Sequence, residues 1–337
     1  MSYRLTAVIP FFQRKSGILQ KAIRSALGQT SIDDFHIIVV DDMSPIPASQ
    51  EVSCFSDFER KRIRVVQQER NGGPGAARNR GLELLEEEDV EYVAFLDSDD
   101  GWLPSHLSNA LVALSSGFDF YFADFFQLNQ EISAFNRAKR IAVADHPLLH
   151  GTSTLHQYKG EMFNQILTGN IIGTSTVVYR FSKFSSLRFR AEYRYAGEDY
   201  LFWLELSRLT EKIAFSSACE CMYGEGVNIY SGSTWDSETS LECIHDDIKY
   251  RKFVLDNMSP NPEQARAVAE KIKELRSMFI RNLIHRFLRR RKIRKGLICN
   301  HLKMDPGLML AVAPALGEVF QSTLGSKNSV SKNNPLP

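Results

Sequence analysis

An acidic segment that directly follows an apolar run is the strongest chemical signal in this chain. Residues 92–96 are apolar and strand-forming, and they lead into Asp97, Ser98, Asp99 and Asp100. Alternate side chains of an extended chain point to the same side, so we expect Asp97 and Asp99 to project together. Neighbouring carboxylates repel unless a cation lies between them, and oxygen ligands suit Mg²⁺ or Mn²⁺ held together with substrate phosphates. A polar turn that caps a helix near Pro104 is the alternative.

A second acidic pair, Asp41 and Asp42, ends the apolar run 35–40. A carboxylate at this position could accept a hydrogen bond from the imide N–H of a nucleobase. The alternative is a solvated loop in which the carboxylate caps its own turn.

Residues 71–81 are rich in glycine, but their spacing matches neither the Walker lysine pattern nor the dinucleotide fingerprint. The small residues could instead let a helix pack closely on a sheet. Arg78 would lie one turn into that helix, either as a guanidinium that contacts a nucleotide or as a surface arginine.

These polar segments need a scaffold, and the first third of the chain predicts one. Apolar runs at 5–9, 35–40, 63–66 and 92–96 alternate with helical patterns at 18–27, 76–85 and 107–114. This alternation indicates βαβ units and an α/β fold with a mostly parallel sheet flanked by helices. Right-handed crossovers place the carboxyl ends of parallel strands at one edge, where such sheets bind ligands. The acidic segments should therefore meet there.

Bulk properties exclude several classes of protein. The 337 residues are 43% hydrophobic and 24% charged, which is typical of a folded globular chain and not of a disordered one. A net charge of +1 gives no overall argument for nucleic acid as a partner. Five scattered cysteines suggest no disulfide framework, and with no apparent secretory leader we expect a cytoplasmic protein.

The C-terminal region has a different composition. We expect three parts: residues 1–236, a helical extension at 237–324, and a disordered tail at 325–337. Residues 278–304 contain no Asp or Glu, and Phe279, Leu283, Phe287 and Leu288 can share one face of a helix. Such a helix could lie on an anionic membrane surface, pack with a solvated basic face, or bind nucleic acid. The cations on its other faces are Arg281, Arg286, Arg289, Arg290, Arg291, Lys292, Arg294 and Lys295.

Taken together and in order, these motifs resemble the inverting family 2 glycosyltransferases with the GT-A nucleotide-sugar fold. The matching segments are residues 6–12, 25–29, 39–42, 71–81, 95–100 and 197–200. Within that family, residues 8–13 and the loop 226–232 look most like bacterial succinoglycan-type exopolysaccharide side-chain glucosyltransferases.

The resemblance implies a donor site for a UDP-sugar. Pro10 and Phe11 would form one wall of the nucleotide pocket, and Asp42 would pair with the uracil ring. Asp97 would lie near the ribose and the metal, and Asp99 would ligate the Mn²⁺ or Mg²⁺ that bridges the diphosphate. The remaining donor contacts it implies are Gln13, Arg78 and Ser98.

The resemblance also places the catalytic base in the pair Glu198 and Asp199, of which we assign Asp199. An acceptor hydroxyl is a poor nucleophile until its proton is removed, so a carboxylate opposite the leaving group is required. An acidic first turn of the helix 200–207 is the alternative. Residues 169–175 could line the acceptor approach or form a tight loop, and His245 could be a distal metal ligand or a surface histidine.

The function implied is transfer of a hexose, with glucose preferred, from a UDP-sugar to a polyprenyl-diphosphate-linked oligosaccharide, forming a β-linkage in exopolysaccharide biosynthesis. We expect such an enzyme to act at the inner face of the bacterial plasma membrane. Nucleotidyl transfer that makes a nucleotide-sugar, and a non-catalytic nucleotide-sugar-binding assembly protein, are the alternatives.

Overall fold

The computed structural model describes residues 5–32, 34–127, 130–224, 237–314 and 316–317. The chain divides into two compact units. The first, here called the sheet unit, comprises residues 1–194 and 198–228, and the second, the helical unit, comprises 195–197 and 229–337. The division expected at residue 236 adjoins a segment outside the described residues and stays a prediction. The expected tail at 325–337 and the loop 226–232 also lie outside them.

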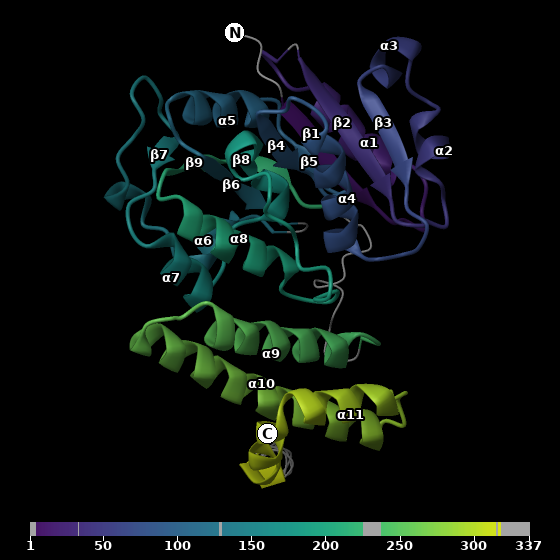
Figure 1. Cartoon of the computed structure of the whole chain (residues 1–337), viewed down its shortest axis with the longest axis vertical. Helices are drawn as coiled ribbons and strands as arrows, with labels where there is room; N and C mark the ends of the chain where they lie inside the picture. Colours follow the sequence, from purple (N-terminus) through teal and green to yellow (C-terminus); the bar gives the residue numbers. More distant parts are fainter. Residues whose placement is uncertain (1–4, 33, 128–129, 225–236, 315, 318–337) are drawn as a thin grey trace, which may run out of the picture. The chain divides into compact units, whose positions relative to one another are not determined.

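The sheet unit is built on a nine-stranded sheet with the order β3-β2-β1-β4-β8-β6-β9-β5, and β7 pairs with β9 (Figure 1). Its strands are β1 (Leu5–Phe11), β2 (Phe35–Asp41), β3 (Ile63–Gln67), β4 (Tyr92–Phe95), β5 (Gly101–Trp102), β6 (Phe120–Phe126), β7 (Leu155–Gln157), β8 (Val178–Arg180) and β9 (Ile213–Met222).

The four apolar runs of the first third form the parallel part of the sheet. β1 pairs in parallel with β2 and β4, and β2 pairs in parallel with β3. β8 runs antiparallel between β4 and β6, which returns β6 and its parallel neighbour β9 to the direction of β1. The prediction of a mostly parallel α/β sheet is confirmed, and the carboxyl ends of β1, β2 and β4 lie at one edge.

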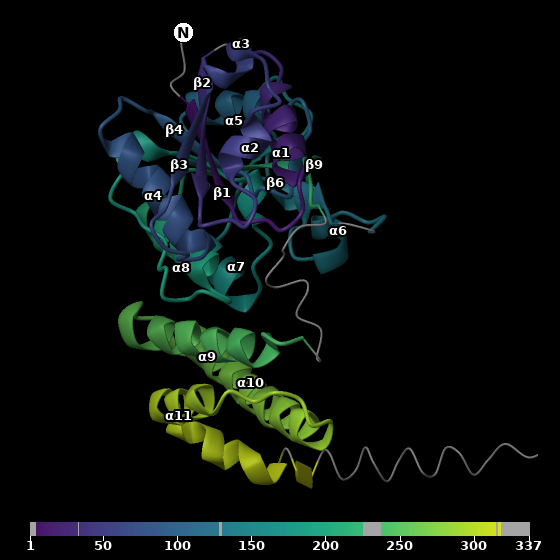
Figure 2. The same ribbon diagram turned by 90° about the vertical axis from the view of Figure 1, so that its right-hand side faces the viewer.

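Helices cover both faces of this sheet. Figure 2 shows α4 on one side of β1 and α1 on the other. The helices of the sheet unit are α1 (Ile18–Leu27), α2 (Ala48–Val52), α3 (Asp57–Arg60), α4 (Pro74–Glu86), α5 (His106–Ser115), α6 (Ala134–Ala138), α7 (Met162–Thr168) and α8 (Glu198–Leu209), with 3₁₀ turns η1 (Val143–Asp145), η2 (Thr174–Thr176) and η3 (Phe181–Lys183).

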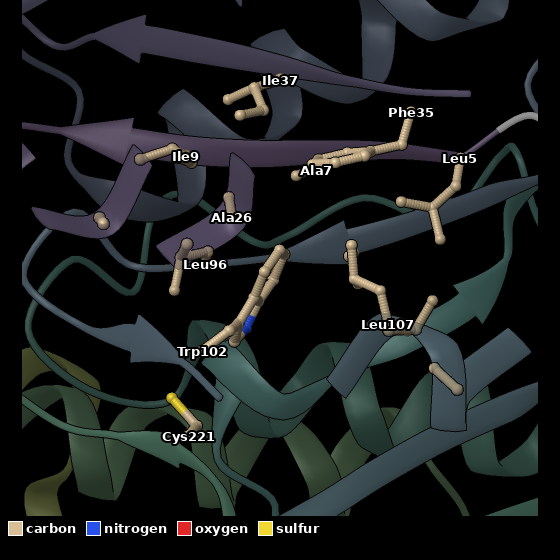
Figure 3. Close-up of a cluster of buried hydrophobic side chains, with 14 of the residues drawn as sticks. Leu5, Ala7, Ile9, Ala26, Phe35, Ile37, Leu96, Trp102, Leu107 and Cys221 are labelled. Atoms are coloured by element: carbon tan, nitrogen blue, oxygen red, sulfur yellow. The ribbon is translucent and has the colours of Figure 1, made fainter. Parts of the chain in front are cut away.

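Alternate residues of β1 pack into different layers. Leu5, Ala7 and Ile9 belong to a core that includes Trp102 of β5, part of which is drawn in Figure 3. Val8 points to the opposite face, where a Cβ placed on Gly81 of α4 would lie 2.5 Å from a Val8 methyl group. The interpretation that small residues in 71–81 allow close packing is therefore confirmed.

The helical unit contains α9 (Ser240–Asn257), α10 (Pro262–Leu288), α11 (Lys295–Met304) and the 3₁₀ turn η4 (Pro306–Ala311). α10 and α9 pack along each other (Figure 1). No helix among the described residues is long and apolar enough to cross a membrane.

The prediction of one continuous basic helix over residues 278–304 is wrong. α10 ends at Leu288, and the basic residues that follow form a turn before α11 begins. Phe279 is fully buried and Arg286 is 4% exposed, so neither can contact a membrane. The guanidinium of Arg286 donates instead to Asn282, to Ser240 and to the backbone carbonyl of Lys292. Periodicity alone could not reveal that these polar partners were available.

Candidate active site

The acidic segment after β4 is a turn and not a continued strand. β4 ends at Phe95, and the backbone N–H of Asp100 donates to the carbonyl of Asp97 across 3.0 Å. Asp97 and Asp99 thus lie on one turn, and the expected strand alternation is wrong. The helix-cap alternative is also wrong, because β5 intervenes and Ser105 is the N-cap residue of α5.

Asp100 lies beneath this turn. It is 5% exposed and accepts hydrogen bonds from the Ser175 hydroxyl at 2.6 Å and from the Gly224 N–H at 3.0 Å. Burial, followed by the charges of Asp97 and Asp99, raises the pKa of Asp100 well above its usual value. The Asp97 side chain is 32% exposed, and Asp99 is also partly exposed. Asp97 and Asp99, the two residues expected to bind a cation, are therefore the partly exposed carboxylates of this turn, whereas Asp100 is buried.

Arg78 joins this turn to the start of α8. Its side chain is 4% exposed, and its guanidinium donates to Asp97 at 2.6 Å and to Glu198 at 3.3 Å. The guanidinium also lies 5.1 Å from the centre of the Phe189 ring. Burial by itself would lower the pKa of Arg78, but the carboxylates of Asp97 and Glu198 outweigh it and hold the pKa above its usual value. The surface-arginine interpretation is wrong, and the nucleotide contact stays a prediction.

Glu198 and Asp199 form the first turn of α8. Burial raises the pKa of Glu198 to about 8, helped by the Asp199 charge and opposed by Arg78. Burial also raises the pKa of Asp199, again against the effect of Arg78. A carboxylate with a raised pKa is a stronger base than an exposed one, and a base near neutral pKa suits proton abstraction from a hydroxyl.

The 3₁₀ turn η2 connects the two acidic segments, a relationship that the sequence did not reveal. The Ser175 hydroxyl contacts Asp100 and also accepts the N–H of Asp97 at 3.0 Å. The neighbouring Thr174 hydroxyl donates to Oδ2 of Asp199 at 3.4 Å. The end of the segment 169–175 thus contacts both carboxylate groups, and its role in the acceptor approach stays a prediction.

Tyr223 is a second residue that the sequence did not single out. Its ring stacks on Phe125 with centroids 4.3 Å apart, and a Cβ on Gly173 would lie 2.4 Å from the Tyr223 hydroxyl. Burial, followed by the charge of Asp100, raises the pKa of Tyr223 well above its usual value, so the phenol stays protonated and can donate. It places a neutral donor beside the loop that holds Asp199.

Asp42 organises the glycine-rich loop. It is 3% exposed and accepts hydrogen bonds from Gln68, Gly72 and Gly73, each at 2.7 Å. The solvated-loop alternative is therefore wrong for Asp42. The neighbouring Asp41 is also buried, but it does cap its own turn by accepting the N–H of Ser44, and it accepts the N–H of Ala48 at the start of α2. A carboxylate has about four acceptor positions, so the three donors to Asp42 leave one of them unused, and pairing with a nucleobase stays a prediction.

The end of β1 adjoins both acidic segments. Pro10 and Phe11 are the last residues of that strand, and the Phe11 carbonyl accepts the N–H of Asp42 at 2.9 Å. The buried Gln13 amide donates to the Ser98 hydroxyl at 3.2 Å. Phe11 thus contacts Asp42, and Gln13 contacts Ser98 within the acidic turn. The roles of Pro10, Phe11, Gln13 and Ser98 in holding a donor stay predictions.

A divalent cation fits this donor set only with help from the substrate. The described residues contain no group of three or more His, Cys, Asp and Glu side chains arranged to hold a metal. Asp97 and Asp99 supply oxygen ligands from one partly exposed turn, and Mg²⁺ sites of this kind are completed by substrate phosphates and water. His245 belongs to the helical unit, where its Nδ1 lies 2.9 Å from Nδ1 of His301, and its role as a metal ligand stays a prediction.

Solved structures with similar folds support this architecture. The S. aureus TarS fragment 1–349, solved in complex with UDP-GlcNAc, has a TM-score of 0.56 at 18% identity and covers 92% of this chain and 81% of that one. The mannosyltransferase PcManGT from Pyrobaculum calidifontis, in complex with GDP-Man and Mn²⁺, has a TM-score of 0.58 at 13% identity and covers 98% and 82%. These matches establish a fold of the GT-A type.

Sequence relatives are more specific. The succinoglycan biosynthesis protein ExoW of Rhizobium meliloti is 33% identical over 246 residues, which cover 71% of this chain and 74% of that protein. A GalNAc(5)-diNAcBac-PP-undecaprenol beta-1,3-glucosyltransferase of Campylobacter jejuni is 25% identical over 60% of this chain and 59% of its own length. The profile of glycosyl transferase family 2 matches residues 6–188, and this chain belongs to that family.

Proposed function

We propose that this chain is a metal-dependent inverting glycosyltransferase that moves a hexose from a UDP-sugar to a hydroxyl of a lipid-linked oligosaccharide. One observation carries the proposal. The η2 turn contacts both the acidic turn after β4 and the first turn of α8, so one element would position both the proposed leaving-group site and the proposed base. Family membership favours sugar transfer over the nucleotidyl-transfer and non-catalytic alternatives.

Asp199 would remove the proton from the acceptor hydroxyl. The raised pKa suits this role, and Thr174 donates to Oδ2 and so limits the rotation of the carboxylate. General-base assistance of this kind is worth roughly 10²- to 10⁴-fold in rate. A single displacement with one base inverts the anomeric centre, so an α-linked donor would yield a β-linked product.

The donor diphosphate would lie at the acidic turn. Asp97 and Asp99 would hold Mn²⁺ or Mg²⁺, which stabilises the negative charge that develops on the departing diphosphate. Arg78 keeps the Asp97 carboxylate fixed through a charge-assisted hydrogen bond of 2.6 Å. The remaining acceptor position of Asp42 would take the imide N–H of uracil, close to the end of β1.

The identities of donor and acceptor are proposed from the relatives. The names of the similar proteins from R. meliloti and C. jejuni refer to succinoglycan biosynthesis and to glucosyl transfer onto an undecaprenol-linked glycan. We therefore favour UDP-glucose as donor and a polyprenyl-diphosphate-linked oligosaccharide as acceptor, in exopolysaccharide biosynthesis at the inner face of the plasma membrane.

Donor specificity tests the proposal directly. We would measure binding and hydrolysis of UDP-, GDP- and dTDP-sugars, each with Mn²⁺ and with EDTA, for the wild type and for Asp99→Asn. We expect UDP release from one UDP-sugar only with Mn²⁺, and loss of that release in Asp99→Asn. The control is Asp57→Asn on α3, where the side chain of Asp57 is 89% exposed. Turnover that survives EDTA or Asp99→Asn would refute the metal assignment, and pyrophosphate release from a nucleoside triphosphate would refute sugar transfer.

A further inference from the structure

The turn between α10 and α11 exposes apolar and basic side chains together. We call residues 287–295 the basic tip. Phe287 is 76% exposed and Leu288 is 70% exposed, although both are large and apolar. Phe279, two turns earlier on α10, is fully buried. The apolar stripe of this helix thus continues beyond the part that the helical unit covers.

Cations follow these two apolar residues in the chain. Arg289, Arg290, Arg291, Lys292 and Lys295 are exposed, and residues 278–304 contain no acidic side chain. Arg294 pairs with Glu242 of α9 at 3.1 Å. The tip therefore combines an exposed apolar pair with five exposed cations in nine residues, besides the paired Arg294.

The tip is held in shape by the buried Arg286. Its guanidinium donates to Asn282 within α10 at 2.9 Å and to the carbonyl of Lys292 at 3.0 Å. The chain reverses at Arg290, which has a φ of +52°. The bond to Lys292 thus ties the turn to the buried end of α10.

We propose that the basic tip docks the chain onto an anionic lipid bilayer, with Phe287 and Leu288 entering the interface and the cations meeting lipid phosphates. Amphipathic surfaces of this composition bind anionic membranes through buried apolar area and electrostatic attraction together. The proposal rests on the proposed function for its biological purpose, since it brings the enzyme to the membrane that carries a lipid-linked acceptor.

Charge favours lipid over the other occupants of this surface. A second copy of the tip would bring like charges together. Residues 318–337 contain Lys327 and Lys332 but only one acidic residue, Glu318, so this segment is itself cationic. A nucleic acid would match the cations but would leave Phe287 and Leu288 without an apolar environment.

The test is flotation of the full-length protein with vesicles of phosphatidylcholine alone and of phosphatidylcholine with phosphatidylglycerol. One variant combines Phe287→Ser and Leu288→Ser, and another combines Arg289→Ser and Lys292→Ser. Matched controls lie elsewhere on the surface. Phe58→Ser removes a phenyl ring that is 75% exposed, and Lys61→Ser with Lys273→Ser removes two exposed cations.

We expect binding to the anionic vesicles only, strong weakening by both tip variants, and no change in the controls. Each removed cation should weaken partitioning roughly fivefold. Raising the salt concentration should release the wild type, which tests the proposal even if a tip variant fails to fold. Equal binding to neutral vesicles, equal loss in the controls, salt-insensitive binding, tip-dependent self-association, or tip-dependent binding of duplex DNA without vesicle binding would each overturn the proposal. Because no donor or acceptor is present, this result is independent of whether the chain transfers a sugar.

Discussion

The hydroxyl of Ser175 donates a hydrogen bond to Oδ2 of Asp100 across 2.6 Å. The same hydroxyl oxygen accepts the backbone N–H of Asp97 across 3.0 Å, so one buried side chain fixes both ends of the acidic turn. The adjacent Thr174 contacts Asp199. The spacing between the proposed metal ligands and the proposed base is thus set by η2, a segment with no charge of its own.

Ser175→Ala should loosen this turn. Removing the hydroxyl leaves one oxygen of the buried Asp100 without that partner, and an unsatisfied buried group of this kind costs about 1–3 kcal/mol. We expect a lower free energy of unfolding in urea and slower UDP-sugar turnover. Ser115→Ala is the control, because the exposed Ser115 hydroxyl bonds only the carbonyl of Val112 in its own helix. Equal unfolding midpoints for the two variants would contradict this prediction.

Asp199→Asn should reduce kcat by roughly 10²- to 10⁴-fold, because an amide cannot remove the proton from the hydroxyl of the acceptor sugar. Glu198→Gln should have a much smaller effect at neutral pH, because the pKa of Glu198 is about 8 and the amide resembles its protonated form. Initial rates of UDP release in the presence of acceptor measure both. Binding of UDP with Mn²⁺ should be retained in each variant. A large loss in Glu198→Gln with none in Asp199→Asn would reverse the assignment of the base.

The raised pKa of Glu198 also predicts a pH dependence of stability. The usual pKa of a glutamate is 4.5, and that of Glu198 in the folded chain is about 8. Between these two pH values, the folded chain binds more protons at Glu198 than the unfolded chain does. The stabilisation that comes from the raised pKa of Glu198 is therefore fully present below pH 4.5 and is lost as the pH rises through about 8. Glu198→Gln removes it, so the variant should gain stability relative to the wild type as the pH rises.

Urea unfolding at several pH values within this window measures the difference between the two proteins. The control is Glu83→Gln, whose side chain is 50% exposed and pairs with Arg80 on the surface of α4. A stability difference between wild type and Glu198→Gln that stays constant across the window would rule the effect out.

Gly173→Ala should disturb the site by crowding. The added Cβ would lie 2.4 Å from the Tyr223 hydroxyl and 2.8 Å from the Phe125 ring, so the stacked pair or η2 must move. Overpacking of this kind costs about 1–3 kcal/mol, and it should also lower kcat through Thr174. Gly296→Ala is the matched control, since its Cβ would meet nothing within 4 Å. Wild-type stability and activity in Gly173→Ala would contradict this prediction, because they would mean that Tyr223 and Phe125 can move aside without cost.

Local sequence patterns predicted the scaffold more fully than the site. The apolar runs 5–9, 35–40, 63–66 and 92–96 became β1 to β4. β1, β2 and β4 are apolar because both of their faces are buried, whereas β3 is the partly buried edge strand. The corresponding helices α1, α4 and α5 appeared where their patterns indicated. The pattern fails at Arg286, because the helical spacing of cations predicts an exposed face whereas this guanidinium is buried among polar partners.

The sequence by itself determined the α/β architecture, the edge at which Asp42 and Asp97 lie, and the family. Those features follow from short-range hydrophobic periodicity and from contiguous motifs. Tertiary structure alone decided which groups touch. Arg78 meets Glu198 from 120 positions away, and Ser175 meets Asp97 from 78 positions away. Such pairs form where distant segments cross, and their geometry depends on the packing of whole elements, which no local pattern of residues encodes.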